Sequence, residues 1–174
     1  HALDLLAVID ALDLDKVVLI GHSYGGGVVL RAALKAPEKV SGIGLVSAFA
    51  LESAVPLDFK WAQVPGLGET LFGAFYKQVP GEKYLLAFDD RDRFVTLEAI
   101  DEVQAMNDKP GALYAALATV RGMDYKTVED QYRSLEMPIT IVWGERDRVV
   151  PLEQGKKLAL AVDAPMTVLP SCGH

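Results

Sequence analysis

The chain has 174 residues, of which 51% are apolar, and it carries a formal net charge of −7. These values are typical of one globular domain. The excess of acidic residues and the lack of any lysine and arginine cluster argue against a surface for nucleic acid or for an anionic membrane, so we expect a small, neutral or weakly charged molecule as the partner.

Cysteine content and apolar runs exclude several further classes of protein. The single cysteine, Cys172, cannot form an internal disulfide, and no Cys and His spacing is typical of a metal site. No apolar run approaches the roughly 20 residues that cross a bilayer, and the residues after His1 lack the basic start of a signal peptide. We therefore expect a cytoplasmic protein with no metal, no cofactor and no membrane span. The sequence favours no particular oligomeric state.

The first quarter of the chain predicts two helices and two strands in alternation. Apolar residues recur at helical spacing over 3–12, and the continuous apolar run 17–20 is typical of a parallel strand that is covered on both faces. A helix over 25–35 follows, and Pro37 stops it. The early glycines of this helix allow it to approach the strand closely. The next strand is predicted over 40–47.

The middle of the chain, over 51–132, has a different composition. Aromatic residues, prolines and glycines are frequent after Phe49, and the patterns predict several helices, including 96–106 and 111–121, with no strand of comparable quality.

The last part of the chain returns to alternating elements. Strands are predicted over 139–143 and 166–169, with a helix over 152–162 between them. Strands that alternate with helices predict a parallel sheet with crossover helices, and the chemistry of such a sheet lies at the carboxyl ends of its strands.

The junction between the first strand and the second helix is Gly21-His22-Ser23-Tyr24-Gly25. A serine at a sharp turn between a strand and a helix has a strained backbone, and glycines two positions before and after it remove side chains that would collide there. The serine hydroxyl then projects toward a substrate.

This G-x-S-x-G sequence after a buried strand resembles the nucleophile elbow of the α/β-hydrolase family. That family carries its acid after a later strand and its histidine last, and the segments Trp143-Gly-Glu-Arg-Asp147 and Ser171-Cys-Gly-His174 follow in this order. The resemblance implies that Ser23 is the nucleophile, His174 the base and Asp147 the acid. It also implies that the backbone N–H of Tyr24 stabilises the oxyanion.

Some of these residues have alternatives. Glu145 competes with Asp147 for the role of the acid, and we favour Asp147 because it matches the Gly-x-x-Asp pattern of the family. His22 is expected to have a packing or loop-supporting role. Cys172 is expected to be a small buried residue and not a nucleophile, because no second base is available for it.

The resemblance also implies a domain organisation. Residues 1–50 and 133–174 would form part of a three-layer α/β-hydrolase core with a parallel sheet, and residues 51–132 an inserted helical lid. Four aromatic residues of the lid would line a hydrophobic pocket or form the core of a helical subdomain: Trp61, Phe72, Phe75 and Tyr76. The charged run 89–93 is expected to be a solvated turn or a helix start.

In the complete fold of this family, several strands precede the elbow strand, and a loop after one of them donates the second oxyanion N–H. Neither precedes Ser23 here, so we expect the chain to be an interior piece of a longer protein. The sheet edge beside the elbow strand would then expose backbone and apolar side chains, and the isolated piece would be marginally stable or prone to aggregation.

The expected function is that of a serine hydrolase, which cleaves an ester-like bond of a small, largely apolar substrate through an acyl-enzyme. Esterase, thioesterase, amidase, carbon–carbon bond hydrolase and perhydrolase activities remain open, because the same triad serves each of them. Two alternatives are a non-catalytic ligand-binding protein of the same fold and an acyltransferase with the same triad.

Overall fold

One parallel sheet of four strands organises the chain, with the strand order β1-β2-β3-β4. The computed structural model describes residues 1–76 and 85–174. The strands are β1 (Val17–His22), β2 (Val40–Val46), β3 (Ile139–Gly144) and β4 (Met166–Leu169). All three pairings are parallel, and β1 lies at an edge of the sheet. The four predicted strands are confirmed.

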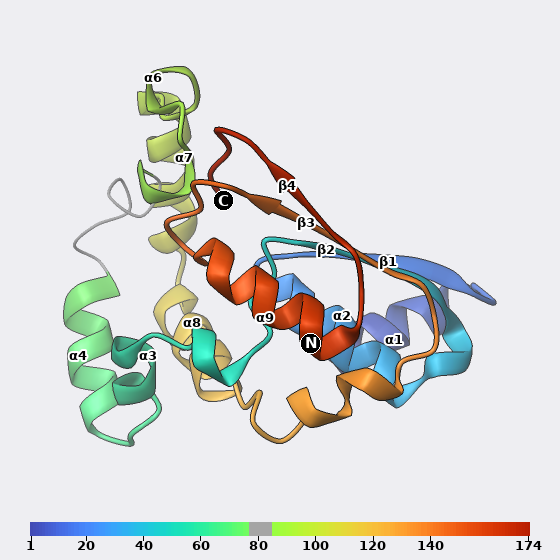
Figure 1. Cartoon of the computed structure of the whole chain (residues 1–174). Helices are drawn as coiled ribbons and strands as arrows, with labels where there is room; N and C mark the ends of the chain where they lie inside the picture. The colour runs from blue at the N-terminus through green and yellow to red at the C-terminus, as the bar shows by residue number, and fades with distance from the viewer. Residues whose placement is uncertain (77–84) are drawn as a thin grey trace.

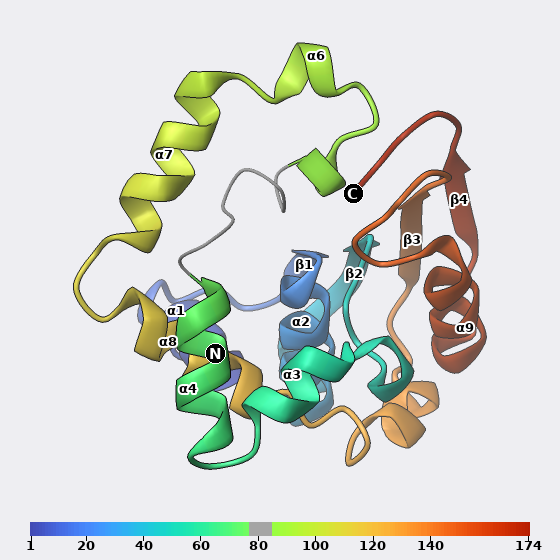
Figure 2. The same ribbon diagram turned by 90° about the vertical axis from the view of Figure 1, so that its left-hand side faces the viewer.

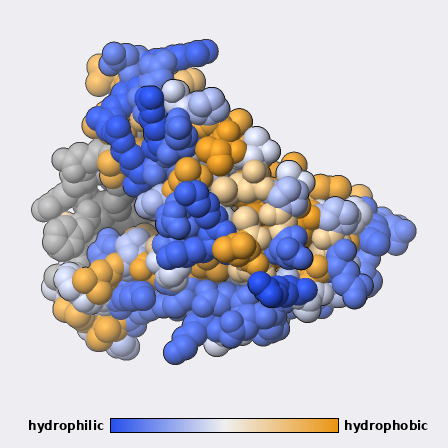
Figure 3. All heavy atoms as spheres, in the orientation of Figure 1, coloured by the Kyte–Doolittle hydropathy of each residue, from blue (hydrophilic) through white to orange (hydrophobic). Residues whose placement is uncertain are grey.

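Three helices cover one face of this sheet (Figure 1). They are α1 (Ala2–Ala11), α2 (Tyr24–Lys35) and α9 (Leu152–Val162), and each corresponds to a predicted helix. Leu30 of α2 and Leu158 of α9 are buried against the sheet together with Trp143 of β3. In the same orientation, apolar residues gather over the strands, whereas much of the surface below them is hydrophilic (Figure 3).

The prediction that the first strand is covered on both faces is wrong for the described residues. Leu19 is buried with 7% exposure, but Val18 and Ile20 on the opposite face are 64% and 73% exposed. A continuous apolar run shows that a strand can be covered on both faces, but it does not supply the covering layer. The described helices that pack on the strands supply one such layer.

The described regular structure between β2 and β3 is helical. Its α-helices include α3 (Leu57–Ala62), α4 (Leu67–Tyr76), α6 (Arg91–Phe94), α7 (Leu97–Asn107) and α8 (Ala112–Arg121), and its 3₁₀ segments are η2 (Glu52–Ala54) and η3 (Glu129–Ser134). A further 3₁₀ turn, η1 (Pro37–Lys39), lies before β2. Within 51–76 and 85–132 there is no strand, as predicted. Figure 2 shows α4, α8, α7 and α6 arranged in an arc beside the sheet.

Side-chain caps account for the starts of two of these helices. Thr96 accepts a hydrogen bond from the N–H of Ala99 at the start of α7, and Asp90 accepts one from the N–H of Arg93 at the start of α6. The charged run 89–93 therefore does contain a helix start, as predicted.

Glycines bring α2 against the sheet. A Cβ on Gly21 would lie 2.5 Å from the carbonyl oxygen of Gly25, and a Cβ on Gly26 would lie 2.3 Å from the Cβ of Ala48. The predicted close approach of helix and strand is therefore confirmed. The expectation of a collision at Gly25 is wrong, because a Cβ there meets no described atom within 4 Å. Packing requires glycine at the positions that face the sheet, and Gly25 does not face it.

These two neighbouring glycines of α2 provide a matched test of the packing. Gly26→Ala should destabilise the protein by about 1–3 kcal/mol, because its methyl group overpacks the contact with Ala48. Gly25→Ala should change stability by less than about 1 kcal/mol, in the stabilising direction, because alanine favours the helix. Urea denaturation of both variants measures the difference, and equal effects would contradict this account of the packing.

Candidate active site

Four polar side chains follow the four strands at the same edge of the sheet. Ser23 follows β1, Ser47 follows β2, Asp147 lies in the loop after β3, and His174 lies in the loop after β4. Because all strands are parallel, their carboxyl ends meet at one edge, where loops of different sequence position converge. The fold thus places these four residues along one rim.

Ser23 has the strained backbone that the elbow motif predicts. Its φ of 50° and ψ of −125° lie outside the regions that residues other than glycine prefer. The surrounding backbone holds this conformation: the N–H of Ser23 donates to the carbonyl of Val46 at 3.0 Å, and its carbonyl accepts from the N–H groups of Gly26 and Phe49 at 3.0 and 2.7 Å. The turn is therefore fixed by both β2 and α2.

His174 and Asp147 form a buried pair. The distance between His174 Nδ1 and Asp147 Oδ2 is 2.9 Å, and the two side chains are 8% and 0% exposed. The other carboxylate oxygen of Asp147 accepts hydrogen bonds from the N–H groups of Val149 and Val150 at 2.9 and 2.8 Å. Both oxygens of the carboxylate are thus fixed, and one of them orients the imidazole.

The carboxyl of Asp147 favours its ionised form. Burial acts to raise its pKa, but hydrogen bonds from His174, from the Val150 backbone and from the Ser47 side chain outweigh burial, so that the pKa lies below its usual value. An ionised carboxylate only accepts hydrogen bonds, so Nδ1 of His174 must carry the proton of this pair. In the neutral imidazole, Nε2 is then free to accept a proton.

The sequence reasoning missed Ser47 as a partner of this pair. Ser47 is 1% exposed, has a positive φ of 42°, and its side chain helps to lower the pKa of Asp147. The signal that was available is its position at the end of the strand between those that lead to Ser23 and Asp147.

Glu145 and Asp147 have different partners in the structure. Oε2 of Glu145 accepts a hydrogen bond from the backbone N–H of Ser171 at 3.1 Å, which links the loop after β3 to the loop after β4. The imidazole of His174 pairs with Asp147. Cys172 is a free, partly buried thiol.

His22 connects the serine turn to His174. Nε2 of His22 donates to the carbonyl oxygen of His174 at 2.7 Å, and the centroids of the two rings are 4.6 Å apart. Among the hydrogen bonds of the described residues, none joins the Ser23 hydroxyl to His174 directly. Tyr24 is the first residue of α2, so its N–H has no acceptor within the helix and is available to a ligand.

Ser23 opens into an apolar cavity of about 410 Å³. Its walls come from the serine turn, from α3 and α8 and from the loop after Asp147, and they comprise Ser23, Tyr24, Phe49, Pro56, Phe59, Ala116, Thr119, Val120, Met123, Val149 and Val150. Of the four aromatic residues expected in this role, Trp61 does not line the cavity and is 49% exposed. The side chains of the other three, Phe72, Phe75 and Tyr76, lie outside the described residues.

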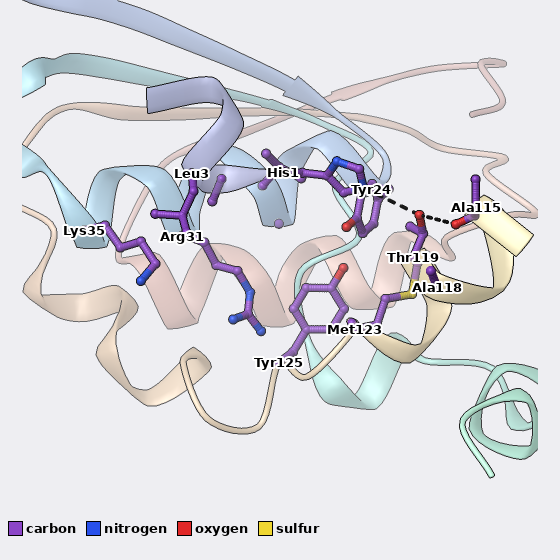
Figure 4. A pocket seen from close by; sticks show the side chains of 14 residues that line it. His1, Leu3, Tyr24, Arg31, Lys35, Ala115, Ala118, Thr119, Met123 and Tyr125 are labelled. Carbon is purple, nitrogen blue, oxygen red and sulfur yellow. Dashed lines mark hydrogen bonds between the residues drawn. The ribbon is translucent and has the colours of Figure 1, made fainter. Parts of the chain in front are cut away.

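A second cavity of about 550 Å³ shares three lining residues with the first, Tyr24, Thr119 and Met123. Figure 4 shows the residues that line this second cavity. Arg31 and Lys35 of α2 line it, and no acidic side chain among the described residues does. The guanidinium of Arg31 lies 5.8 Å from the ring centroid of Tyr125 and donates to the carbonyl of Asp124.

Two kinds of feature are absent from the part of the chain that the structure describes. No group of three or more histidine, cysteine, aspartate or glutamate residues could hold a metal ion there. Among the same residues, no helix has both the length and the apolar character to cross a membrane.

A parallel sheet, a strained serine between a strand and a helix, and a histidine–aspartate pair at the same rim define a class of α/β protein with a nucleophile elbow. A family model for the alpha/beta hydrolase family matches residues 1–174. The chain therefore belongs to the α/β-hydrolase family.

Relatives and solved structures agree with this assignment. The chain is 28% identical over 172 residues to the dihydrolipoyllysine-residue acetyltransferase component of the acetoin cleaving system of Pseudomonas putida. The aligned region covers 97% of this chain and 43% of that protein. It is 27% identical over 180 residues to a 2-hydroxy-6-oxo-2,4-heptadienoate hydrolase of Pseudomonas putida, and this aligned region covers 98% of this chain and 61% of the relative. The chain thus spans 43% and 61% of the length of these relatives.

The fold is also that of a solved enzyme. A thermophilic esterase from Thermogutta terrifontis superposes with a TM-score of 0.75 at 23% identity, over 99% of this chain and 63% of that chain. At this identity, the likeness establishes the α/β-hydrolase fold.

The lowered pKa of Asp147 predicts a pH-dependent contribution to stability. A carboxyl whose pKa is lower in the folded state stabilises the fold above its unfolded pKa of about 4, and the contribution is lost as the pH falls through the folded value. Asp147→Asn should therefore cost about 1–3 kcal/mol at pH 7, and the difference from wild type should shrink below pH 4.

Chemical denaturation at several pH values measures this difference. The exposed carboxylate of Asp130 provides the control, because Asp130→Asn should change stability by less than about 0.5 kcal/mol at each pH. A cost for Asp147→Asn that stays constant down to pH 2 would contradict the assignment.

Proposed function

We propose that the protein containing this chain is a serine hydrolase that cleaves an ester-like bond through an acyl-enzyme on Ser23. The observation that carries the proposal is the buried pair of His174 and Asp147, 2.9 Å apart, at the same rim as a serine with a strained backbone. A buried imidazole whose Nδ1 is held by a carboxylate is the arrangement that a serine needs in a general base.

In the proposed reaction, Nε2 of His174 removes the proton of the Ser23 hydroxyl while the oxygen attacks the acyl carbonyl. The ionised carboxylate of Asp147 accepts a hydrogen bond from Nδ1–H throughout and stabilises the imidazolium that forms. The imidazolium then gives its proton to the leaving group, and the acyl group stays on Ser23. Water, deprotonated by His174, releases the acid and restores the hydroxyl.

The oxyanion of the tetrahedral intermediate is stabilised by the N–H of Tyr24. This group lies at the amino terminus of α2, where the helix dipole also favours negative charge.

The substrate in this proposal is small and largely apolar in its acyl part. The cavity next to Ser23 has a volume of about 410 Å³ and walls that are mainly aliphatic and aromatic. Phe59, Ala116 and Val120 contribute to these walls from residues 51–132, so this helical segment acts as the lid that selects the substrate. We favour hydrolysis as the reaction because one relative is named a 2-hydroxy-6-oxo-2,4-heptadienoate hydrolase.

A second candidate function is acyl transfer, in which an alcohol or thiol replaces water in the last step. It is favoured by one observation, the name of the acetyltransferase component that is 28% identical to this chain. Product analysis with and without an acceptor alcohol separates the two functions, because transfer yields a new ester and hydrolysis yields only the acid.

Replacement of the nucleophile tests the proposed reaction. Ser23→Ala should lower the turnover of an acyl ester by about 10⁶-fold, because the hydroxyl forms the covalent intermediate. Intact-mass analysis after treatment with a fluorophosphonate should show one adduct on the wild-type protein and none on the variant. Well-folded wild-type protein without an adduct would favour a non-catalytic binding protein instead.

The size of the cavity predicts the effect of a residue on its wall. Ala116→Phe should narrow the cavity. We expect it to lower kcat/KM for a long acyl ester about tenfold relative to an acetate ester, because a long acyl chain then loses apolar contacts with the cavity wall. Ala118 of the same helix lines the other cavity, so Ala118→Phe is the matched control. An equal loss for short and long esters in Ala116→Phe would show that this cavity does not hold the acyl group.

A further inference from the structure

The short segment 87–89, between α4 and α6, contacts the loop that carries His174. The backbone N–H of His174 donates to the carbonyl oxygen of Ala87 at 2.6 Å. The segment comes from the helical part of the chain between β2 and β3, and it lies beside the carboxyl-terminal residues (Figure 2). A part of the proposed lid is thus hydrogen-bonded directly to the proposed base.

The same segment contacts the loop that carries Asp147. Nη1 of Arg146 pairs with Oδ2 of Asp89 at 2.9 Å, and these side chains are 54% and 16% exposed. Arg146 immediately precedes Asp147, and its backbone N–H donates to the carbonyl of Cys172 at 2.8 Å. Arg146 therefore links three segments: its backbone contacts the loop of His174 and its side chain contacts the helical insertion.

These three segments are packed without side chains between their backbones. A Cβ on Gly173 would lie 2.3 Å from the carbonyl oxygen of Ala87 and 3.0 Å from the N of Asp89. A Cβ on Gly144 would lie 2.0 Å from the carbonyl oxygen of Gly173. With backbones this close, a shift of the segment 87–89 displaces the loop of His174.

We propose that Asp89 and Arg146 are positioning residues, whose ion pair holds the helical insertion against both loops and so fixes the geometry of the His174–Asp147 pair. The proposal rests on the proposed function, in which that pair activates Ser23. The side chain of Arg146 is 54% exposed, and ion pairs that solvent reaches in this way contribute little to global stability. Its effect therefore lies in the geometry of the rim, where a displacement of about 1 Å costs up to about 10²-fold in rate.

The test uses the full-length protein with Asp89→Asn, Arg146→Gln, the double neutral variant and the exchanged pair Asp89→Arg with Arg146→Asp. Asp92→Asn and Arg148→Gln are matched controls, because Asp92 lies exposed in α6 just after the segment 87–89 and Arg148 lies exposed in the loop of Asp147. Two readouts are needed: the rate at which a fluorophosphonate labels Ser23, and the proton NMR signal of His174 Nδ1–H, which a hydrogen bond to a carboxylate shifts downfield.

We expect each neutral variant to lower the labelling rate about tenfold and to weaken or move the Nδ1–H signal, with an unchanged midpoint of urea unfolding. The labelling rate of the double neutral variant should fall no further than that of either single variant, because each single substitution already removes the same ion pair. The exchanged pair should recover most of the rate. Added salt should slow the wild-type protein and leave the double neutral variant unchanged, because salt screens the pair.

The failure of this proposal is distinct from the failure of the proposed function. Wild-type labelling together with normal labelling and a normal Nδ1–H signal in both single variants would overturn the positioning role and leave the hydrolase intact. If the wild-type protein is not labelled, the proposed hydrolase function is wrong, and the Nδ1–H signal alone decides the positioning role. Loss of this signal in both neutral variants, but not in the controls, supports that role, and an unchanged signal overturns it. Additive losses without recovery in the exchanged pair would also overturn the proposal.

Discussion

The parallel alignment of the four strands is the constraint on which the rest of the site depends. Each strand ends at the same edge of the sheet, and each is followed by a polar residue of the rim: Ser23, Ser47, Asp147 and His174. Hydrogen bonds of the sheet and the buried layer under α2 and α9 fix this edge, so residues more than a hundred positions apart in sequence need only short loops to meet. The described helices between β2 and β3 in the sequence leave the parallel order of the sheet uninterrupted.

Two local features of this edge of the sheet determine the chemistry that its residues can carry out. The turn at Ser23 is strained, and the backbone of β2 and α2 holds it through three hydrogen bonds. The Asp147 carboxylate is buried but favours its ionised form, because His174 and two backbone N–H groups donate hydrogen bonds to it and the Ser47 side chain also lowers its pKa. A charge that is fixed in this way defines the tautomer of the imidazole, and the tautomer decides which nitrogen is free to accept a proton.

Much of the fold and the residue types of the site could be predicted from local patterns. Apolar runs located the four strands, and the glycines around Ser23 identified the turn, because backbone strain and close packing leave a direct signature in sequence. The apolar run 17–20 by itself did not predict the exposed face of Val18 and Ile20, since such a run does not reveal which layers cover a strand; only the family resemblance led us to expect exposed apolar side chains at this edge. Neither could the contact of Ser47 with Asp147 or of Asp89 with Arg146, which join residues far apart in the chain and depend on how the loops pack.

The proposed reaction depends on the activation of Ser23 by the His174–Asp147 pair. The most direct measurement is a crystal structure of the full-length protein after reaction with an alkyl fluorophosphonate. The account predicts phosphorus bonded to the Ser23 oxygen, a phosphonyl oxygen within about 3 Å of the Tyr24 N–H, and Nε2 of His174 within hydrogen-bond distance of the adduct. An adduct on another residue, or a His174 ring that faces away from the phosphonylated serine, would contradict it.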